Sequence, residues 1–549
     1  MMLIDHEATK PYRTSGAWGR VALDMLVHRA AQGHPEHAAI ADATDRLDWT
    51  GGAPRSLTFA ELDREIDATA AAYRALGLEE GSVVGLFSPN TVDTVVALLG
   101  GLRAGLIVAP MPLTWRGADI QAGLDLVGAK AVIAADRLED APLAEIVRDT
   151  AVNVFGVRFV LGLGDDLPDG VAPFAEVRDP DGKLAEPAGF TADHVATITW
   201  TEGRKGAPQP LPRSHNQWIA TGLMHLLEGR IEPATVLASA FAPTGLVGIG
   251  AVLVPWLLTG GTLHLSHFRS LDGLADDIAR AGARHAILPE PLVDAVAQRL
   301  EAAGAEQPAY TAIWRNGHGA ADAKIASTRA GVDIFTLDEW ALVASLRAGD
   351  RPSPIPIGPV NAPRGTEQAP ILAETRLVAR QRRNGEADDT LVSGEIAVSG
   401  AMVPEIGWPG GRAEPPLRDD AGFVRTGLFA RPVSEFPVTA EITGRGPGTA
   451  SLGGLSVPLD QVQRLIGERP DATKSAAFSE ADRIVGARLR AAVVGEAEPG
   501  FTAAELEAYL DGRGVALHKR PHEADAVSGL PVRIDGHIDR EALARRFSK

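Results

Sequence analysis

The stretch Thr199-Trp-Thr-Glu-Gly-Arg-Lys-Gly-Ala-Pro-Gln-Pro-Leu-Pro-Arg-Ser-His215 governs how the rest of the chain is interpreted. Gly203 and Gly206 flank a basic pair, and such a loop can hold an anion by pointing backbone N–H groups at it. The three prolines that follow have no N–H to donate, so they remove donors and stiffen the loop. Glu202 would bring a negative charge toward a bound anion. The stretch is therefore either an altered anion-binding loop or a solvated polar loop between two strands.

The composition indicates a globular protein with more than one domain. The chain has 549 residues, of which 45% are hydrophobic and 23% charged, and this length predicts two or more domains. The formal charge of −18 argues against nucleic acid or an anionic membrane as the main partner. With no cysteine, disulfides, thiol nucleophiles and cysteine-bound metals are excluded.

We read no signal peptide and expect no membrane span, since apolar runs such as 247–258 are short. A cytoplasmic protein is expected.

Short β-rich runs alternate with longer amphipathic stretches, which is typical of α/β layering. Thr58 and Glu61 have the spacing of a capping box at a helix start, and Asn90 is expected to open a second helix. A βαβαβ run of this kind is best satisfied by a parallel sheet with right-handed crossovers. The predicted elements are a helix over 58–76, a strand over 83–87, a helix over 92–104 and strands over 106–109 and 131–134.

The second half of the chain continues this pattern and restarts after Gly446. Thr502 and Glu505 predict another capping box. We place a domain boundary near residue 446, which gives a large domain over 1–446 and a small one over 447–549. The predicted elements are strands over 331–335, 372–378, 395–399 and 488–494, a surface loop over 407–420 and a helix over 503–510.

Blocks in a fixed order along nearly the whole chain resemble the adenylate-forming superfamily, which includes acyl-CoA synthetases, aryl-acid and cyclohexanecarboxylate activators and peptide-synthetase adenylation domains. The opening stretch follows the family form T-S-G-T-T-G-x-P-K-G-V-x-x-S-H at Thr201, Gly203, Gly206, Pro208, Ser214 and His215. The other blocks are 12–18 with 38–40, 57–62, 104–110, 255–262, 393–396 with Gly400, 426–427, 444–445, 519–521 and 530–540. The resemblance implies an α/β adenylate-forming fold, with a large N-terminal α/β domain and a small mobile α+β C-terminal domain that acts as a lid.

The resemblance also implies roles for individual residues. Thr201, Gly203 and Gly206 belong to the phosphate-binding loop, and Arg445 to a second cofactor-binding block. Glu339 stands where the family has a catalytic glutamate that coordinates Mg²⁺, and Asp338 beside it could help to hold a cation.

Several residues depart from the family pattern where the family handles ATP. Glu202 replaces a serine and Gln209 replaces a lysine of the phosphate loop. Leu428 replaces the aspartate that binds both ribose hydroxyls, so a ribose would lose hydrogen bonds at ~1–3 kcal/mol each. His537 takes the catalytic lysine's position, and losing a donor to the transition state costs ~3–4 kcal/mol. Pro447 falls at the hinge and restricts rotation of the small domain. ATP and Mg²⁺ are therefore doubtful as cofactors.

The acyl-binding segment departs less from the family pattern. Thr244, Gly245 and Gly248 lie in a small, apolar segment without a cation, and Gly317 and Gly319 are expected to face it. A charged head group would be buried there without a partner. We therefore expect a neutral aliphatic or alicyclic acyl group, unless these glycines only pack a helix against the sheet.

Three functions remain open. The chain is an ATP-independent enzyme that passes an acyl group between CoA and the phosphopantetheine of an acyl carrier protein, a non-catalytic pseudoenzyme or regulatory subunit, or an acid–thiol ligase that forms acyl-AMP. Loss at four separate chemical positions favours the first two. A small acyl thioester or carboxylic acid is the expected ligand, and a homodimer is among the open assemblies.

The adjacent pairs Ser214-His215 and Ser266-His267 do not favour a hydrolase triad, because neighbours in a strand point to opposite faces.

Overall fold

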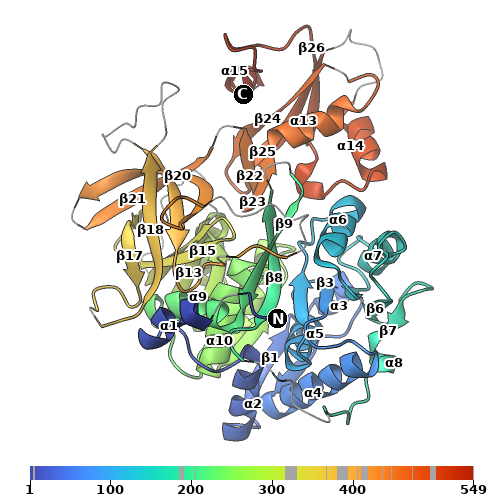
Figure 1. The fold of residues 1–549 in the computed structure, drawn as a ribbon, viewed down its shortest axis with the longest axis vertical. Coiled ribbons are helices and arrows are strands. Elements are labelled where there is room, and N and C mark those ends of the chain that lie inside the picture. The colour runs from blue at the N-terminus through green and yellow to red at the C-terminus, as the bar shows by residue number, and fades with distance from the viewer. Residues whose placement is uncertain are drawn as a thin grey trace.

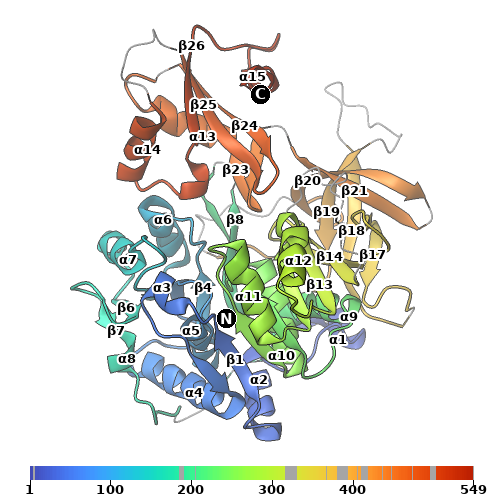
Figure 2. The ribbon, with the colours of Figure 1, turned by 180° about the vertical axis from the view of Figure 1, so that it is seen from behind.

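Three sheets and their helices form the bulk of the protein, and a smaller C-terminal part lies at one end (Figures 1 and 2). The computed structural model describes residues 1–3, 6–184, 189, 191–203, 206–315, 325, 330–366, 368–379, 393–404, 406–409, 418–435, 437–446, 448–472, 474–494 and 502–547. This architecture confirms the expected α/β fold of a large N-terminal unit with a smaller C-terminal region.

The first sheet has seven strands among the described residues, in the order β7-β6-β5-β3-β4-β8-β9, and its β3, β4 and β5 pair in parallel as the βαβαβ pattern predicted. Its strands are β3 (Val83–Phe87), β4 (Ile107–Pro110), β5 (Ala131–Ala135), β6 (Phe159–Leu163), β7 (Ala172–Pro173), β8 (Val195–Glu202) and β9 (Pro208–Ser214). The neighbouring helices are α3 (Arg46–Thr50), α4 (Phe59–Ala75), α5 (Val92–Arg103), α6 (Gly117–Val127), α7 (Leu143–Ala151) and α8 (Phe174–Val177).

The helix starts show one confirmed prediction and one correction. Thr58 caps α4 through a complete capping box with Glu61. Thr91, not Asn90, caps α5 by accepting from the N–H of Thr94. Asn90 instead donates to the carbonyls of Ser239 and Ser266 at 2.9 and 3.1 Å, and thus ties the first sheet to the second.

The second sheet has eight strands among the described residues, in the order β15-β14-β13-β12-β10-β11-β1-β2. Its strands are β1 (Ala38–Asp42), β2 (Ser56–Thr58), β10 (Val236–Ser239), β11 (Thr262–Leu265), β12 (His285–Pro289), β13 (Tyr310–Arg315), β14 (Gly331–Leu337) and β15 (Ala341–Leu346). The helices of this region are α1 (His6–Thr14), α2 (Leu23–Gly33), α9 (His215–Glu228), the π-helix η1 (Leu246–Leu253), α10 (Val254–Thr259), α11 (Leu271–Ala281), the 3₁₀ turn η2 (Glu290–Leu292) and α12 (Val293–Ala302).

The third sheet is antiparallel, and its order among the described residues is β16-β21-β20-β19-β18-β17. Its strands are β16 (Ile355–Pro356), β17 (Gly358–Asn361), β18 (Ile371–Ala379), β19 (Gly394–Ser399), β20 (Val424–Glu435) and β21 (Val438–Arg445). The predicted surface loop over 407–420 falls largely outside the described residues, since only 407–409 and 418–420 are described.

The C-terminal part, residues 448–547, has hydrophobic clusters of its own, centred on α13 and on β24–β25. Its elements are β22 (Thr449–Leu452), β23 (Leu455–Pro458), α13 (Leu459–Gly467), β24 (Ser475–Asp482), β25 (Gly486–Val494), α14 (Ala503–Gly512), η4 (Leu517–Lys519), β26 (Glu523–Val527) and α15 (Arg540–Phe547). Thr502 caps α14 as predicted. The domain boundary near residue 446 stays a prediction.

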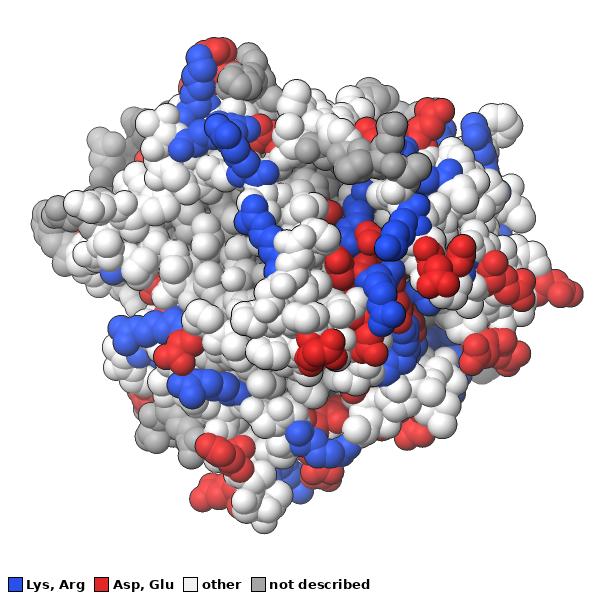
Figure 3. All heavy atoms as spheres, turned by 90° about the horizontal axis from the view of Figure 1, so that it is seen from below, with Lys and Arg blue, Asp and Glu red and all other residues white. Residues whose placement is uncertain are grey.

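The surface carries charges of both signs. On the face seen from below, basic and acidic side chains lie beside one another rather than in separate fields (Figure 3). In the described part of the chain, no helix is both long and apolar enough to cross a membrane.

Candidate functional site

The candidate site lies where β8, β14 and the C-terminal hairpin β22–β23 meet. The parallel strands β12, β13 and β14 end at this edge, and ligands of open α/β sheets bind beyond the carboxyl ends of such strands. Asp338 and Glu339 follow β14 directly. Asp338 has φ +53°, a left-handed conformation that aspartate tolerates better than most residues.

Asp338 is the centre of a polar cluster that joins three segments of the chain. Thr201 at the end of β8 donates to Asp338 Oδ2. Arg445 Nη2 lies 2.7 Å from Asp338 Oδ1, and Ser456 Oγ donates to the same oxygen at 2.9 Å. Burial opposes ionisation of Asp338, but Arg445 and these hydrogen bonds outweigh it and lower its pKa. The predicted cofactor-binding residues Thr201 and Arg445 thus meet, and they meet at this carboxylate.

Glu339 is half-buried beside the first turn of η1. The backbone N–H of Leu246 donates to Glu339 Oε2 at 3.2 Å. Burial raises the pKa of Glu339 to about 7, and the attraction of Arg213 offsets this only in part. A carboxyl group that titrates near neutral pH suits proton transfer.

Arg213 on β9 holds the segment that carries Glu339. Its guanidinium is fully buried and donates to the carbonyls of Glu339 and Trp340, and to Thr199 Oγ1 at 2.8 Å. The guanidinium also stacks over Trp218. Sequence reasoning missed Arg213 because its partners lie far along the chain.

The β8–β9 loop, residues 203–207, uses its own backbone groups. Gly203 N–H donates to the carbonyl of Ala207, and Gly206 N–H donates to that of Gly203, both at 2.8 Å. Gly206 adopts φ +82°, and an added Cβ there would overlap Gln461 of the C-terminal part. The two glycines predicted to bind phosphate therefore have their N–H groups occupied. Residues 204–205 lie outside the described residues.

The expectation that Glu202 repels a bound phosphate needs correction, because its charge has a partner. Lys519 Nζ lies 2.8 Å from Glu202 Oε1 and 2.7 Å from Asp119 Oδ1. Burial opposes the charge on Lys519, but the two carboxylates outweigh it and raise its pKa. Sequence alone identified Lys519 only as part of a family block.

The three prolines of the opening stretch also have a different role from the expected one. Pro208, Pro210 and Pro212 lie in β9, an edge strand that pairs with β8, and not in a loop. Positions without an N–H are tolerated in an edge strand where the N faces away from the neighbouring strand. Gln209 is buried between them.

Leu428 and His537, which stand where the family has an aspartate and a lysine, lie in different environments. Leu428 is buried in the main hydrophobic core, so it packs as an ordinary core leucine. His537 is exposed in a turn of the C-terminal part, where its backbone N–H donates to Asp535 Oδ1. Its catalytic role stays a prediction, and Pro447 lies outside the described residues.

The glycines of the predicted acyl segment are packed tightly. An added Cβ on Gly248 would lie 1.8 Å from the carbonyl oxygen of Ala242, and one on Gly245 would lie 2.8 Å from Glu339 Oε1. Gly248 therefore packs backbone against backbone, which favours the packing alternative at that position. Thr244, the residue before Gly245, is half-buried.

Other parts of the predicted acyl site are not described by the structure. Gly317 and Gly319 lie outside the described residues. A cavity of ≈ 380 Å³ between α2 and α5 is lined by Asp24, His28, Arg103 and His215, and none of these belongs to the acyl segment.

The hairpin β22–β23 places the C-terminal part against the site. Gly454 at its turn has φ +86° and packs on the indole of Trp314, where an added Cβ would lie 2.5 Å from the ring. Trp314 in turn meets Phe241 edge-on at 5.3 Å. Ser456 of the same hairpin reaches Asp338, so the hairpin completes the polar cluster.

The described side chains do not form a ready metal site. Among them, no group of three or more His, Cys, Asp or Glu residues is arranged to hold a metal ion. Asp338, expected to help to bind a cation, is instead paired with Arg445. The role of Glu339 as a metal ligand stays a prediction.

Residues 27–350 match the family of AMP-binding enzymes, which is more than half of the chain, and the protein belongs to this family. A salicyl-AMP ligase / salicyl-S-ArCP synthetase of Mycobacterium tuberculosis is 26% identical over 552 residues, covering 98% of this chain and 92% of that protein. A 2,3-dihydroxybenzoate-AMP ligase of Bacillus subtilis is 23% identical, covering 99% and 97%.

Solved structures of adenylate-forming enzymes share the fold. MbtA of Mycobacterium smegmatis, in its apo form, superposes with a TM-score of 0.65 at 24% identity, covering 99% of this chain and 98% of that one. The amide bond synthetase McbA from Marinactinospora thermotolerans gives 0.75 at 17% identity, covering 96% and 100%. These likenesses extend over the C-terminal part as well.

Proposed function

We propose that this member of the AMP-binding family binds acyl thioesters and passes the acyl group between CoA and the phosphopantetheine of a carrier protein without ATP. The observation that carries the proposal is the state of the β8–β9 loop. The N–H groups of Gly203 and Gly206 bond within the loop, and the carbonyl of Gly206 accepts from Gln461 and Lys519. The N–H groups of these two glycines are thus engaged by the protein and are not directed at a polyphosphate.

The residues present fit ATP poorly at two further points. Gln209, where the family has a lysine, is buried in β9 and brings no positive charge, and Leu428 offers a buried methyl group where a ribose would need a hydrogen-bond acceptor. Each lost hydrogen bond to the nucleotide costs ~1–3 kcal/mol. We therefore derive no step through ATP.

Acyl transfer between two thiols needs one proton acceptor and no energy source. The incoming thiol loses its proton, its sulfur attacks the thioester carbonyl, a new C–S bond forms, the old C–S bond breaks and the leaving thiolate takes the proton back. Glu339, whose pKa burial raises to about 7, is suited to accept and return that proton.

A second candidate is an acid–thiol ligase that forms an acyl adenylate. The observation that favours it is the cluster of Thr201, Asp338 and Arg445 beside Glu339, since the family resemblance gives three of these four residues nucleotide or metal roles. The salicylate and dihydroxybenzoate relatives support an aryl acid as its substrate.

Two calorimetric titrations separate the candidates. ATP·Mg²⁺ at millimolar concentration should give no binding heat, and an acyl-CoA should give a saturable one. A carrier protein should then become acylated in the absence of ATP. Pyrophosphate exchange that depends on an added acid would refute the proposal and establish the ligase. Heat from neither ligand would also refute it and favour a non-catalytic subunit.

A further inference from the structure

One lysine of the C-terminal part is buried between two carboxylates of the N-terminal part. The exposed fractions of the side chains are 1% for Lys519, 9% for Glu202 and 8% for Asp119. Glu202 ends β8 and Asp119 lies in the first turn of α6, where the helix dipole favours a negative charge. Lys519 therefore connects two separate elements of the N-terminal part.

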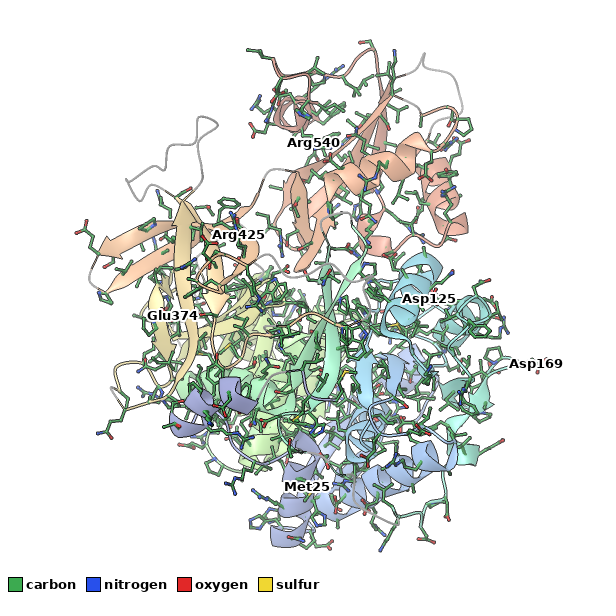
Figure 4. All side chains as sticks on the ribbon, in the orientation of Figure 1. Met25, Asp125, Asp169, Glu374, Arg425 and Arg540 are labelled. Carbon is green, nitrogen blue, oxygen red and sulfur yellow. The ribbon has the colours of Figure 1, made fainter. Side chains whose placement is uncertain are left out.

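Backbone contacts surround this ion pair on both sides. Lys519 Nζ donates to the carbonyl of Gly206 at 3.1 Å, and Gln461 donates to the same oxygen at 2.8 Å. Ala516 N–H donates to Asp119 Oδ2 at 3.1 Å, and Leu517 N–H donates to the carbonyl of Thr114 at 2.7 Å. In Figure 4, α6, marked by Asp125, faces the C-terminal part, which carries Arg540.

The charges of this interface are unequal on the two sides. Both carboxylates belong to the N-terminal part, and the C-terminal part faces them with the single ammonium group of Lys519 and with the ring of His518, whose Nε2 lies 3.7 Å from Glu202 Oε1. Breaking a buried pair by removing one partner is strongly unfavourable because it leaves a charge uncompensated. A rotation of the C-terminal part that withdrew Lys519 would likewise leave Glu202 and Asp119 without the ammonium group until water reached both carboxylates.

We propose that Lys519, Glu202 and Asp119 form a latch that keeps the C-terminal part docked on the β8–β9 loop whether or not a ligand is bound. Glu202 is the part of the latch that the family loop lacks, since the family has a serine at that position. The inference concerns orientation and holds whichever reaction the site performs.

The absence of cysteine allows a direct test in the full-length protein. Phe155 in the N-terminal part and Ile534 in the C-terminal part are both fully exposed, so Phe155→Cys and Ile534→Cys take one label each. Pulsed electron paramagnetic resonance measures the distance between the two spin labels. The measurement is made in the protein with these two cysteines as background, and in the same protein with Glu202→Gln or Lys519→Met added. Arg513→Gln is the control, because it removes an exposed ion pair within the C-terminal part.

The background protein and the Arg513→Gln control should show one distance, unchanged by ATP or an acyl-CoA. Glu202→Gln should raise the share of a second distance roughly tenfold, because Lys519 then keeps only Asp119 as an acid partner, and Lys519→Met should raise it more, because both acids then lose the ammonium group. A single unchanged distance in both variants would overturn the latch, as would two comparable populations in the background protein.

Loss of folding in Lys519→Met would leave the test intact. Glu202→Gln changes one oxygen to nitrogen and keeps the shape of the side chain, and circular dichroism checks its fold. Gln461→Ala removes a neighbouring hydrogen bond without touching the charges, and it should shift the distances less than Glu202→Gln does. The reverse order would show that hydrogen bonds, and not the ion pair, hold the C-terminal part.

Discussion

Replacing Glu339 by glutamine should make the protein more stable at alkaline pH and leave it little changed at acid pH. Burial raises the pKa of this carboxyl from 4.5 to about 7, so the folded state holds a proton that the unfolded state releases between these values. The stability that the proton confers is fully present below pH 4.5 and is lost as the pH rises to about 7. Glutamine has no proton to lose.

The size of the effect follows from the two pKa values. A difference of about 2.5 units corresponds to about 3 kcal/mol at 1.36 kcal/mol per unit. A unit of about 400 residues unfolds with an entropy of about 0.8 kcal/mol per kelvin, so the melting temperature should differ by about 3–4 °C. The N–H of Leu246 can still donate to the amide oxygen of the glutamine, which keeps the neighbouring turn of η1 in place.

Melting temperatures of both proteins at pH 4.5 and pH 8.5 test this reasoning. The other titrating groups are common to both, so only the change in the difference between them matters. Glu374→Gln, on the exposed face of β18 (Figure 4), is the matched control and should give a difference that does not depend on pH. If Glu339→Gln behaved like the control, the carboxyl would not be protonated near neutral pH, and its proposed proton transfer would fail with it.

Two further changes test the packing of the site. Gly248→Ala should lower the melting temperature by several degrees, because its Cβ would lie 1.8 Å from the carbonyl oxygen of Ala242. Gly33→Ala is the control and should be neutral, because its Cβ would meet no atom within 4 Å. Equal melting temperatures of the two variants would show that the segment around Gly248 adapts easily. Leu428→Asp restores the family residue, yet it buries a charge in the core and should destabilise the protein by several kcal/mol without creating nucleotide binding. Calorimetric ATP binding by this single variant would contradict our view of the position.

Local patterns predicted the elements well, and the site less well. The spacing of Thr58 and Glu61 determined where α4 begins, because a capping box involves only neighbours in the chain. The environment of Glu202 could not be predicted in this way, since its partner Lys519 comes from the other end of the sequence. The same holds for Asp338, whose partner Arg445 lies 107 residues further along the chain. In each case, the sequence showed a charge but not the group opposite it.

The alternating prolines of β9 have a consequence for assembly. Pro208, Pro210 and Pro212 sit opposite Glu202, Trp200 and Ile198, so the outward-facing backbone positions of this edge strand carry no N–H. All seven residues of β9 are buried, so these positions lie inside the protein, and each proline removes a backbone N–H that would otherwise need a buried partner. This edge of the first sheet is therefore closed to strand pairing by packing, and a carrier protein or a second copy would have to dock elsewhere on the protein.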